Sequence, residues 1–138
     1  MKYLILFGLL IFSLSISAQD EKETQIYSSV LQSGEQLIFG DKFIRFKEVV
    51  SDSRCPKGVT CVWAGEAKVL IEIFENGTLM SEKVVIINPN IIDKMPLQFS
   101  AGKGTYSLSA IGLFPYPCTN SKTAKINYRL ELQVSENL

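Results

Sequence analysis

The residues best suited to chemistry lie in one short stretch of the chain, positions 52–66. It holds two of the three cysteines, Cys55 and Cys61, and the only tryptophan, Trp63. A proline and a glycine stand between the two cysteines and let the chain turn, so the two thiols can approach each other. The chemistry open to such a pair is disulfide formation in an oxidising compartment, or binding of a soft metal ion.

Three disulfide pairings are open to the cysteines, and spacing alone does not choose among them. A Cys55–Cys61 bond would close a small ring and contribute roughly 2–2.5 kcal/mol, whereas a bond from either of them to Cys118 would contribute roughly 4–5 kcal/mol. We favour the short ring, with Cys118 left as a free thiol. Three thiolates could instead hold Cu(I), but the Cys-x-x-Cys spacing of zinc and redox sites is missing, so we predict no metal and no cofactor.

Histidine is absent from the chain, which removes the commonest general base and the commonest metal ligand. Ser-His-Asp and Cys-His hydrolases and His-ligated metal sites are thereby excluded. The remaining acids and nucleophiles are not paired by spacing, so we predict no enzyme and no catalytic residue. They are Asp52, Glu66 and Glu72, with Tyr116 or Cys118.

The charge balance also bears on partners. Lys plus Arg and Asp plus Glu number 14 each, which gives no basic face for nucleic acid. We therefore expect no nucleic-acid partner.

Five residues are candidates for binding. Trp63 has two interpretations: packed over the disulfide, which we favour, or exposed as a platform for a sugar ring or a partner protein. Arg54 could bind a carboxylate or a partner, while Asp52 is predicted to accept backbone N–H bonds in a turn. Lys57, between the cysteines, and Tyr116, flanked by two prolines, complete the set.

Short segments of strand-like sequence lie on both sides of this stretch. The strands that we expect span 25–31, 35–39, 42–50, 66–75, 78–88, 97–100, 105–114 and 125–134. Because no stretch has a convincing helical period, about seven or eight such strands predict an all-β fold, an antiparallel β-sandwich or barrel.

Three of these segments carry finer predictions. Asn76-Gly77 is the strongest hairpin signal, since both turn positions need positive φ. The apolar run 84–87 predicts a strand that is buried on both faces or lies at a sheet centre. In the last strand alternate residues are predicted to face one way, namely Ile126, Tyr128, Leu130, Leu132 and Val134.

The first 18 residues have the pattern of a signal peptide. Lys2 precedes an apolar run over 4–12, and small residues up to Ala18 precede a polar, acidic segment. The run is too short to span a membrane comfortably, so we expect no membrane span after cleavage. Residues 19–138 would then form a single β domain that is periplasmic or extracellular.

Asp52-Ser53-Arg54-Cys55-Pro56 followed by Cys61-Val62-Trp63-Ala64-Gly65 resembles a motif of small exported proteins and lipoproteins of Bacteroidota-type bacteria, whose function is uncharacterised. The likeness is strong over 52–69 and weak elsewhere, and this chain lacks the lipidation cysteine of the lipoprotein members. The resemblance implies export and the Cys55–Cys61 bridge. It implies no activity, ligand or catalytic residue.

These observations predict an exported, disulfide-braced β-domain that acts as a binding or structural module. It would present residues 52–66 to a protein or glycan in the cell envelope or outside the cell. The alternative is a protease inhibitor in which the Cys55–Cys61 ring exposes Lys57 as a preorganised substrate loop, although this ring is short and Gly58 loosens it. An enzyme that works without histidine is the third hypothesis.

Overall fold

The computed structural model describes residues 24–89, 97–101, 104–119 and 126–137. The predicted signal peptide over 1–18 lies outside these ranges and stays a prediction. No helix occurs within them, and therefore none that is long and apolar enough to cross a membrane.

The described residues form eight strands, which matches the number expected. They are β1 (Thr24–Gln32), β2 (Gln36–Phe39), β3 (Lys42–Asp52), β4 (Ala67–Glu75), β5 (Thr78–Ile87), β6 (Leu97–Ala101), β7 (Gly104–Phe114) and β8 (Arg129–Asn137).

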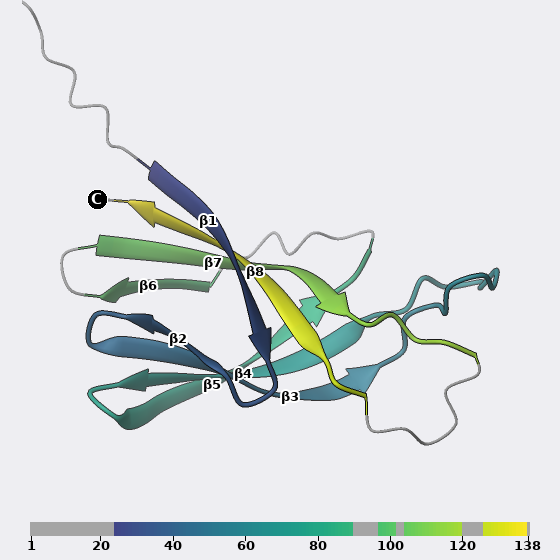
Figure 1. Ribbon diagram of the computed structural model, residues 1–138, viewed down its shortest axis with the longest axis horizontal. Coiled ribbons are helices and arrows are strands. Elements are labelled where there is room, and N and C mark those ends of the chain that lie inside the picture. Colours follow the sequence, from purple (N-terminus) through teal and green to yellow (C-terminus); the bar gives the residue numbers. More distant parts are fainter. Residues whose placement is uncertain (1–23, 90–96, 102–103, 120–125, 138) are drawn as a thin grey trace, which may run out of the picture.

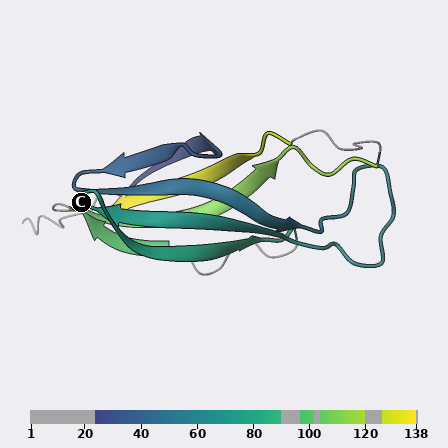
Figure 2. The same ribbon diagram turned by 90° about the horizontal axis from the view of Figure 1, so that it is seen from below.

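The strands make two antiparallel sheets of four strands each. One sheet has the order β1-β8-β7-β6 and the other has the order β2-β3-β4-β5. The two sheets pack against each other, as the views in Figure 1 and Figure 2 show. The predicted all-β sandwich is therefore confirmed.

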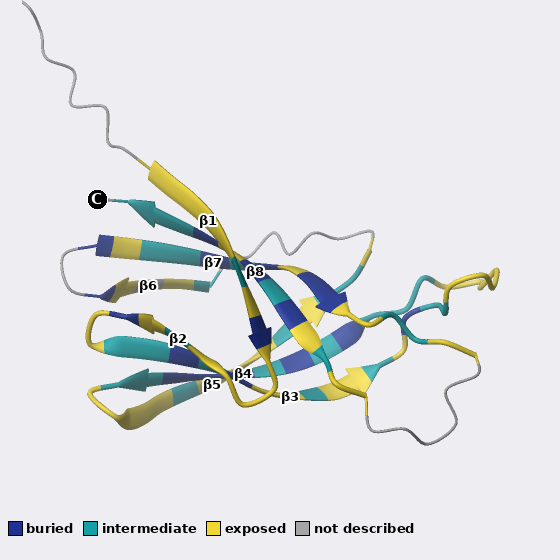
Figure 3. Ribbon diagram, in the orientation of Figure 1, coloured by how far each residue is buried: buried dark blue, intermediate teal, exposed yellow. Residues whose placement is uncertain are grey.

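One apolar cluster fills the space between the sheets. Phe46 and Val69 from one sheet and Leu130 and Val134 from the other are each 0% exposed. Alternate residues along each strand face this cluster, because side chains in a strand point in turn to opposite faces. Figure 3 shows the alternation as bands, of buried and intermediate residues along β4 and of buried, intermediate and exposed residues along β8.

The predicted hairpin at Asn76-Gly77 is confirmed, with φ of 49° and 78° at the two turn residues. The last strand begins later than predicted, at Arg129. Leu130, Leu132 and Val134 face the core as expected, but Ile126 precedes the strand and is 40% exposed. The alternation over 126–128 therefore did not mark a strand.

The prediction for the apolar run 84–87 is wrong. Among the described strands, β5 lies at an edge of its sheet and pairs with β4 alone. Val85 and Ile87 pack against the core, whereas Val84 and Ile86 are 55% and 46% exposed on the outer face. The prediction of burial came from four consecutive branched residues, but only every second side chain of the run packs against the core.

The fold places the cysteine-containing stretch at one end of the sandwich. Asp52 at the end of β3 pairs with Ala67 at the start of β4, so residues 53–66 leave the sheet as one long loop. We call these residues the disulfide loop. Figure 2 shows the loop extending beyond the ends of both sheets.

Candidate functional site

The disulfide loop contains the predicted covalent ring. Cys55 and Cys61 form a disulfide with Cα atoms 6.0 Å apart, so this pairing is confirmed. Within the ring the chain turns back on itself: Val59 N–H donates to the Pro56 carbonyl at 3.4 Å, and Gly58 has a φ of +80°. Cys118 lies exposed outside this bond.

A hydrogen-bonded stem joins the ring to the sandwich. Ser53 N–H donates to the Glu66 carbonyl at 2.8 Å, and Cys55 N–H donates to the Ala64 carbonyl at 2.9 Å. Gly65 lies in this stem with φ +68°, and a Cβ there would come within 1.8 Å of the Ser53 carbonyl oxygen. Glycine at position 65 is what allows the two arms of the loop to approach so closely.

Arg54 fixes the base of the loop to the opposite sheet. Its Nε and Nη2 donate to the two carboxylate oxygens of Asp52 at 2.8 and 2.7 Å. Its Nη1 donates to the Leu113 carbonyl at 2.6 Å, and Nη2 also donates to the Pro115 carbonyl at 3.0 Å. Arg54 is only 3% exposed. The guanidinium therefore links the end of β3 to the end of β7.

Asp52 is the anion of this anchor. Its carboxylate also accepts a hydrogen bond from Tyr128 Oη at 3.1 Å, and it accepts the Arg54 N–H at 3.2 Å, which is the backbone bond predicted for it. Burial alone would raise the pKa of Asp52, but the hydrogen bonds and charge of Arg54 outweigh burial and hold the pKa below its ordinary value. Asp52 is thus ionised at neutral pH.

Tyr116 lies between two cations. The Arg54 guanidinium carbon is 4.3 Å from the centre of the Tyr116 ring, and the Lys57 ammonium is 5.6 Å from the same centre. Such contacts are attractive because the face of an aromatic ring carries negative charge. Tyr116 covers the anchor, and Lys57, although exposed, has its ammonium over the same ring.

The outer part of the loop exposes three apolar side chains, beside the exposed polar residues Lys57 and Thr60. Val62 is 91% exposed and Trp63 is 82% exposed, while Val59 is 46% exposed. We call these three residues the apolar tip. The favoured interpretation of Trp63, packed over the disulfide, is therefore wrong, because packing would cover much more of the indole. The six-residue separation of the cysteines closes a ring too small to shelter a tryptophan beside it.

Four of the five predicted binding residues divide into two groups, while the fifth, Lys57, is exposed with its ammonium over the Tyr116 ring. Asp52, Arg54 and Tyr116 belong to the anchor, where the two charged side chains are used inside the protein. Trp63 belongs to the apolar tip, together with Val62, which the sequence reasoning missed. The signal that could have found Val62 is its place next to Trp63 in a loop rich in glycine and proline, too far from a strand to reach the core.

The acids named as possible catalytic bases each pair with a different cation. Asp52 pairs with Arg54, Glu66 pairs with Lys68 at 3.3 Å, and Glu72 pairs with Lys47 at 2.9 Å. Hydrogen bonds from Lys47 and Arg45 lower the pKa of Glu72. Over the described ranges, no three His, Cys, Asp or Glu residues come together in a way that could hold a metal ion.

No family model, no curated protein and no solved structure matches this chain. The assignment of the site therefore depends on geometry: a covalent ring, a buried ionic anchor and an exposed apolar tip on one loop.

Proposed function

We propose that this chain is an exported β-domain that binds a protein or glycan partner through the apolar tip of the disulfide loop. The observation that carries the proposal is the exposure of Trp63 and Val62 on a loop whose base is fixed. Exposed apolar groups gathered in one place are a mark of interaction sites. Tryptophan is also among the residues that contribute most to binding free energy at interfaces.

The anchor and the ring support this proposal by limiting the motion of the loop. Ordering a flexible loop on binding costs free energy, and a loop that is already ordered avoids that cost. The disulfide, the stem and the Arg54 contacts act at successive levels of the loop. The tip is therefore presented in one conformation before a partner arrives.

The sequence predicts export, and the disulfide is compatible with it. Structural disulfides persist in oxidising compartments, such as the periplasm or the cell exterior, and are rare in the cytoplasm. The signal-like residues 1–18 point the same way.

The composition of the tip favours a protein over a glycan. A sugar ring needs several hydrogen-bonding groups beside the aromatic platform, whereas two of the exposed side chains in the outer part of the loop are those of Val59 and Val62, beside Lys57 and Thr60. An apolar pocket on a protein would accept all three side chains together.

The test is capture of partners from envelope extract with the mature oxidised protein. We expect a partner that is retained by the wild type and lost with Trp63→Ala, and that is weakened by Val62→Ala. Both sites are exposed, so both variants should keep wild-type stability to within about 0.5 kcal/mol. Ile38→Ala is a matched control, since Ile38 is 64% exposed but lies on β2, away from the loop.

Two outcomes would contradict the proposal: a partner retained equally by Trp63→Ala, or no specific partner at all. A Cys55→Ser/Cys61→Ser variant tests the role of the ring. We expect it to remain folded, because the ring contributes only roughly 2–2.5 kcal/mol, and to bind the partner less tightly.

The contacts of Lys57 do not favour the inhibitor hypothesis. Its ammonium lies over Tyr116, and the backbone turns at Gly58 where a protease would need an extended substrate. We expect micromolar protein to leave trypsin-like activity unchanged, and strong inhibition would restore this alternative.

A further inference from the structure

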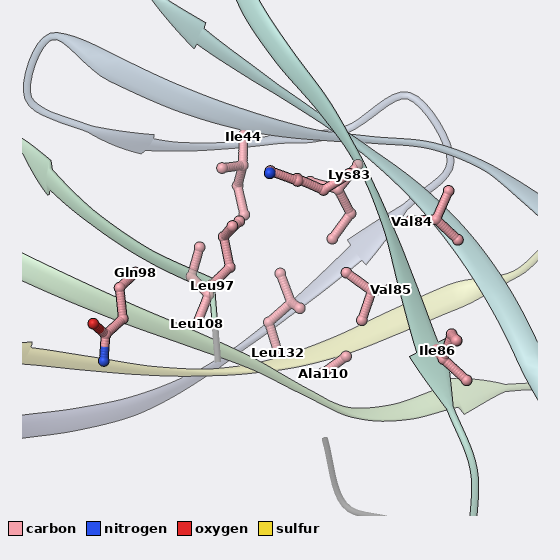
Figure 4. A pocket seen from close by; sticks show the side chains of 11 residues that line it. Ile44, Lys83, Val84, Val85, Ile86, Leu97, Gln98, Leu108, Ala110 and Leu132 are labelled. Atoms are coloured by element: carbon pink, nitrogen blue, oxygen red, sulfur yellow. The ribbon is translucent and has the colours of Figure 1, made fainter. Parts of the chain in front are cut away.

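A cavity lies away from the disulfide loop, where the two sheets part along the edge strands β5 and β6. Its volume is about 390 Å³, and its floor is formed by Ile44 and Ile71 from one sheet and Leu108 and Leu132 from the other. A volume of this size is within the range of small-molecule sites, roughly 300–1,000 Å³. Figure 4 shows the aliphatic side chains of the two sheets facing each other across it.

Lys83 is the unusual residue of this cavity. In the β4–β5 ladder it pairs with Ile71, whose side chain is 3% exposed and faces the core. Directly paired residues point to the same face of a sheet, so Lys83 is directed toward the gap between the sheets, although its place on the edge strand leaves it exposed. Figure 4 shows its side chain extending from β5 toward Ile44. The next inward positions of β5, Val85 and Ile87, are aliphatic.

The charge of Lys83 is not balanced within the described residues. None of them forms an ion pair or hydrogen bond with its ammonium. The polar side chains among the described lining residues are Lys83 and Gln98, and no acid lines the cavity there. An aliphatic space with one cation at its mouth is complementary to a molecule with an apolar chain and an anionic end.

We propose that this cavity binds a monocarboxylate with an unbranched apolar chain, of the medium-chain fatty acid class. The carboxylate pairs with Lys83 Nζ at the mouth, and the chain lies between the sheets over Ile71, Leu108 and Leu132. A neutral chain would leave the ammonium unused, and a cationic ligand would be repelled by it. This site shares no residue with positions 52–66 and does not depend on the function proposed for them.

A second explanation for Lys83 makes different predictions. An inward-pointing charge on an edge strand can hinder edge-to-edge pairing between molecules. If that were its whole role, Lys83→Met would cause self-association, and the wild type would bind no fatty acid.

The experiment is a titration of the mature, oxidised wild-type protein, followed through its backbone amide resonances. The probes are decanoate, octanoate, hexanoate and neutral decanol. We expect saturable shifts at residues around the cavity, such as Val85 and Leu108, and none at the apolar tip. Each methylene removed from the carboxylate should weaken binding about three- to fourfold, since methylenes bind by leaving water.

The charge is tested with Lys83→Met, which keeps the length and apolar stem of the side chain. We expect its affinity for decanoate to fall about two- to fivefold, the scale of an ion pair at an exposed site, and its affinity for decanol to be kept. Lys68→Met is the matched control, because Lys68 pairs in the ladder with Ile86 and so lies on the outer face of the same sheet. It should change neither affinity.

Several results would overturn the proposal. One is the absence of saturable shifts in the wild type at millimolar decanoate. Another is a set of shifts confined to the apolar tip. A third is equal affinity of the wild type for decanoate and decanol. If Lys83→Met self-associates, Lys83→Gln serves in its place, and an unchanged decanoate affinity in that variant overturns the role of the ammonium.

Discussion

Arg54 uses its whole guanidinium inside the protein. Nε, Nη1 and Nη2 donate to the Asp52 carboxylate and to two backbone carbonyls of the opposite sheet. Only the planar fork of an arginine can reach these acceptors together, because a lysine offers a single compact ammonium. Removing the cation would leave a buried carboxylate and buried carbonyls without donors.

This geometry predicts a large effect of Arg54→Met on stability. We expect a loss of roughly 3–5 kcal/mol in the free energy of unfolding, the cost of breaking a buried ion pair from one side. Urea unfolding followed by circular dichroism measures it. Arg129→Met is the control, since Arg129 is exposed on β8 and its loss should change stability by less than about 0.5 kcal/mol. Equal effects of the two variants would mean that the anchor is not structural.

Asp52 makes the same anchor sensitive to acid. Burial raises the pKa of Asp52, but Arg54 and the Tyr128 hydroxyl outweigh burial, so the pKa in the folded protein lies below the unfolded value. The stabilisation is therefore fully present above the unfolded pKa of about 3.9, and it is lost as the pH falls through the folded pKa.

We therefore compare the wild type with Asp52→Asn by urea unfolding at neutral pH and near pH 3. The wild type should be more stable at neutral pH, and the difference should shrink in acid, because protonated Asp52 resembles asparagine. Glu72, whose pKa is also lowered, is present in both proteins and cancels in the comparison. A difference that does not change with pH would contradict this account.

At the scale of elements, the stem of the disulfide loop depends on Gly65. Two constraints act there: a positive φ, and backbone contact with Ser53. Gly34 carries only the first constraint, since its φ is +90° and a Cβ added there would meet nothing within 4 Å. Comparing substitutions at Gly65 and Gly34 therefore separates the cost of the close contact with Ser53 from the cost of the positive φ.

Gly34→Ala should cost about 1–2 kcal/mol, the penalty of an L-residue in the left-handed region. Gly65→Ala should cost clearly more, because the stem must also open to admit the new methyl group. The free energy of unfolding in urea measures both. Similar losses for the two variants would show that the stem is looser than its hydrogen bonds indicate.

The strands themselves were largely predictable from local pattern. The Asn76-Gly77 turn fixed the β4–β5 hairpin, and alternation marked Leu130, Leu132 and Val134 as core. The position of β5 at a sheet edge was not predictable, because it depends on which strand pairs with which across the whole chain. The inward direction of Lys83 follows from that pairing, so the cavity could not be predicted from the sequence either.

At the scale of the molecule, the sequence identified the disulfide loop but not which of its residues anchor it and which are exposed. Arg54 looked available for binding because its acceptors, the carbonyls of Leu113 and Pro115, lie about sixty positions away in the chain. Trp63 was expected to pack over the disulfide because tryptophans are mostly covered in folded proteins. The role of Arg54 depends on where β7 ends relative to β3, and the exposure of Trp63 depends on how far the loop leaves the sheets; local sequence encodes neither.

The exposure of Trp63 can be checked by the tryptophan fluorescence of the whole protein. Because Trp63 is the only tryptophan, the fluorescence excited at its absorption edge comes from one exposed indole. The indole is in water in both the folded and the unfolded chain. We therefore expect the emission maximum to move little through an unfolding transition in which circular dichroism shows cooperative loss of the sheets.

A control variant moves the single tryptophan into the core. In Phe46→Trp/Trp63→Phe the new indole occupies a position that is 0% exposed, so its emission should shift strongly to the red on unfolding. If the wild type shows the same strong shift, Trp63 is covered in the native state. The apolar tip would then be lost, and with it the surface through which the loop is proposed to bind. A small shift in the wild type and a large shift in the control would instead show that Trp63 is in water in the folded protein. Exposing an indole to water is unfavourable, so an exposed tryptophan on a fixed loop supports the proposal that a partner covers it.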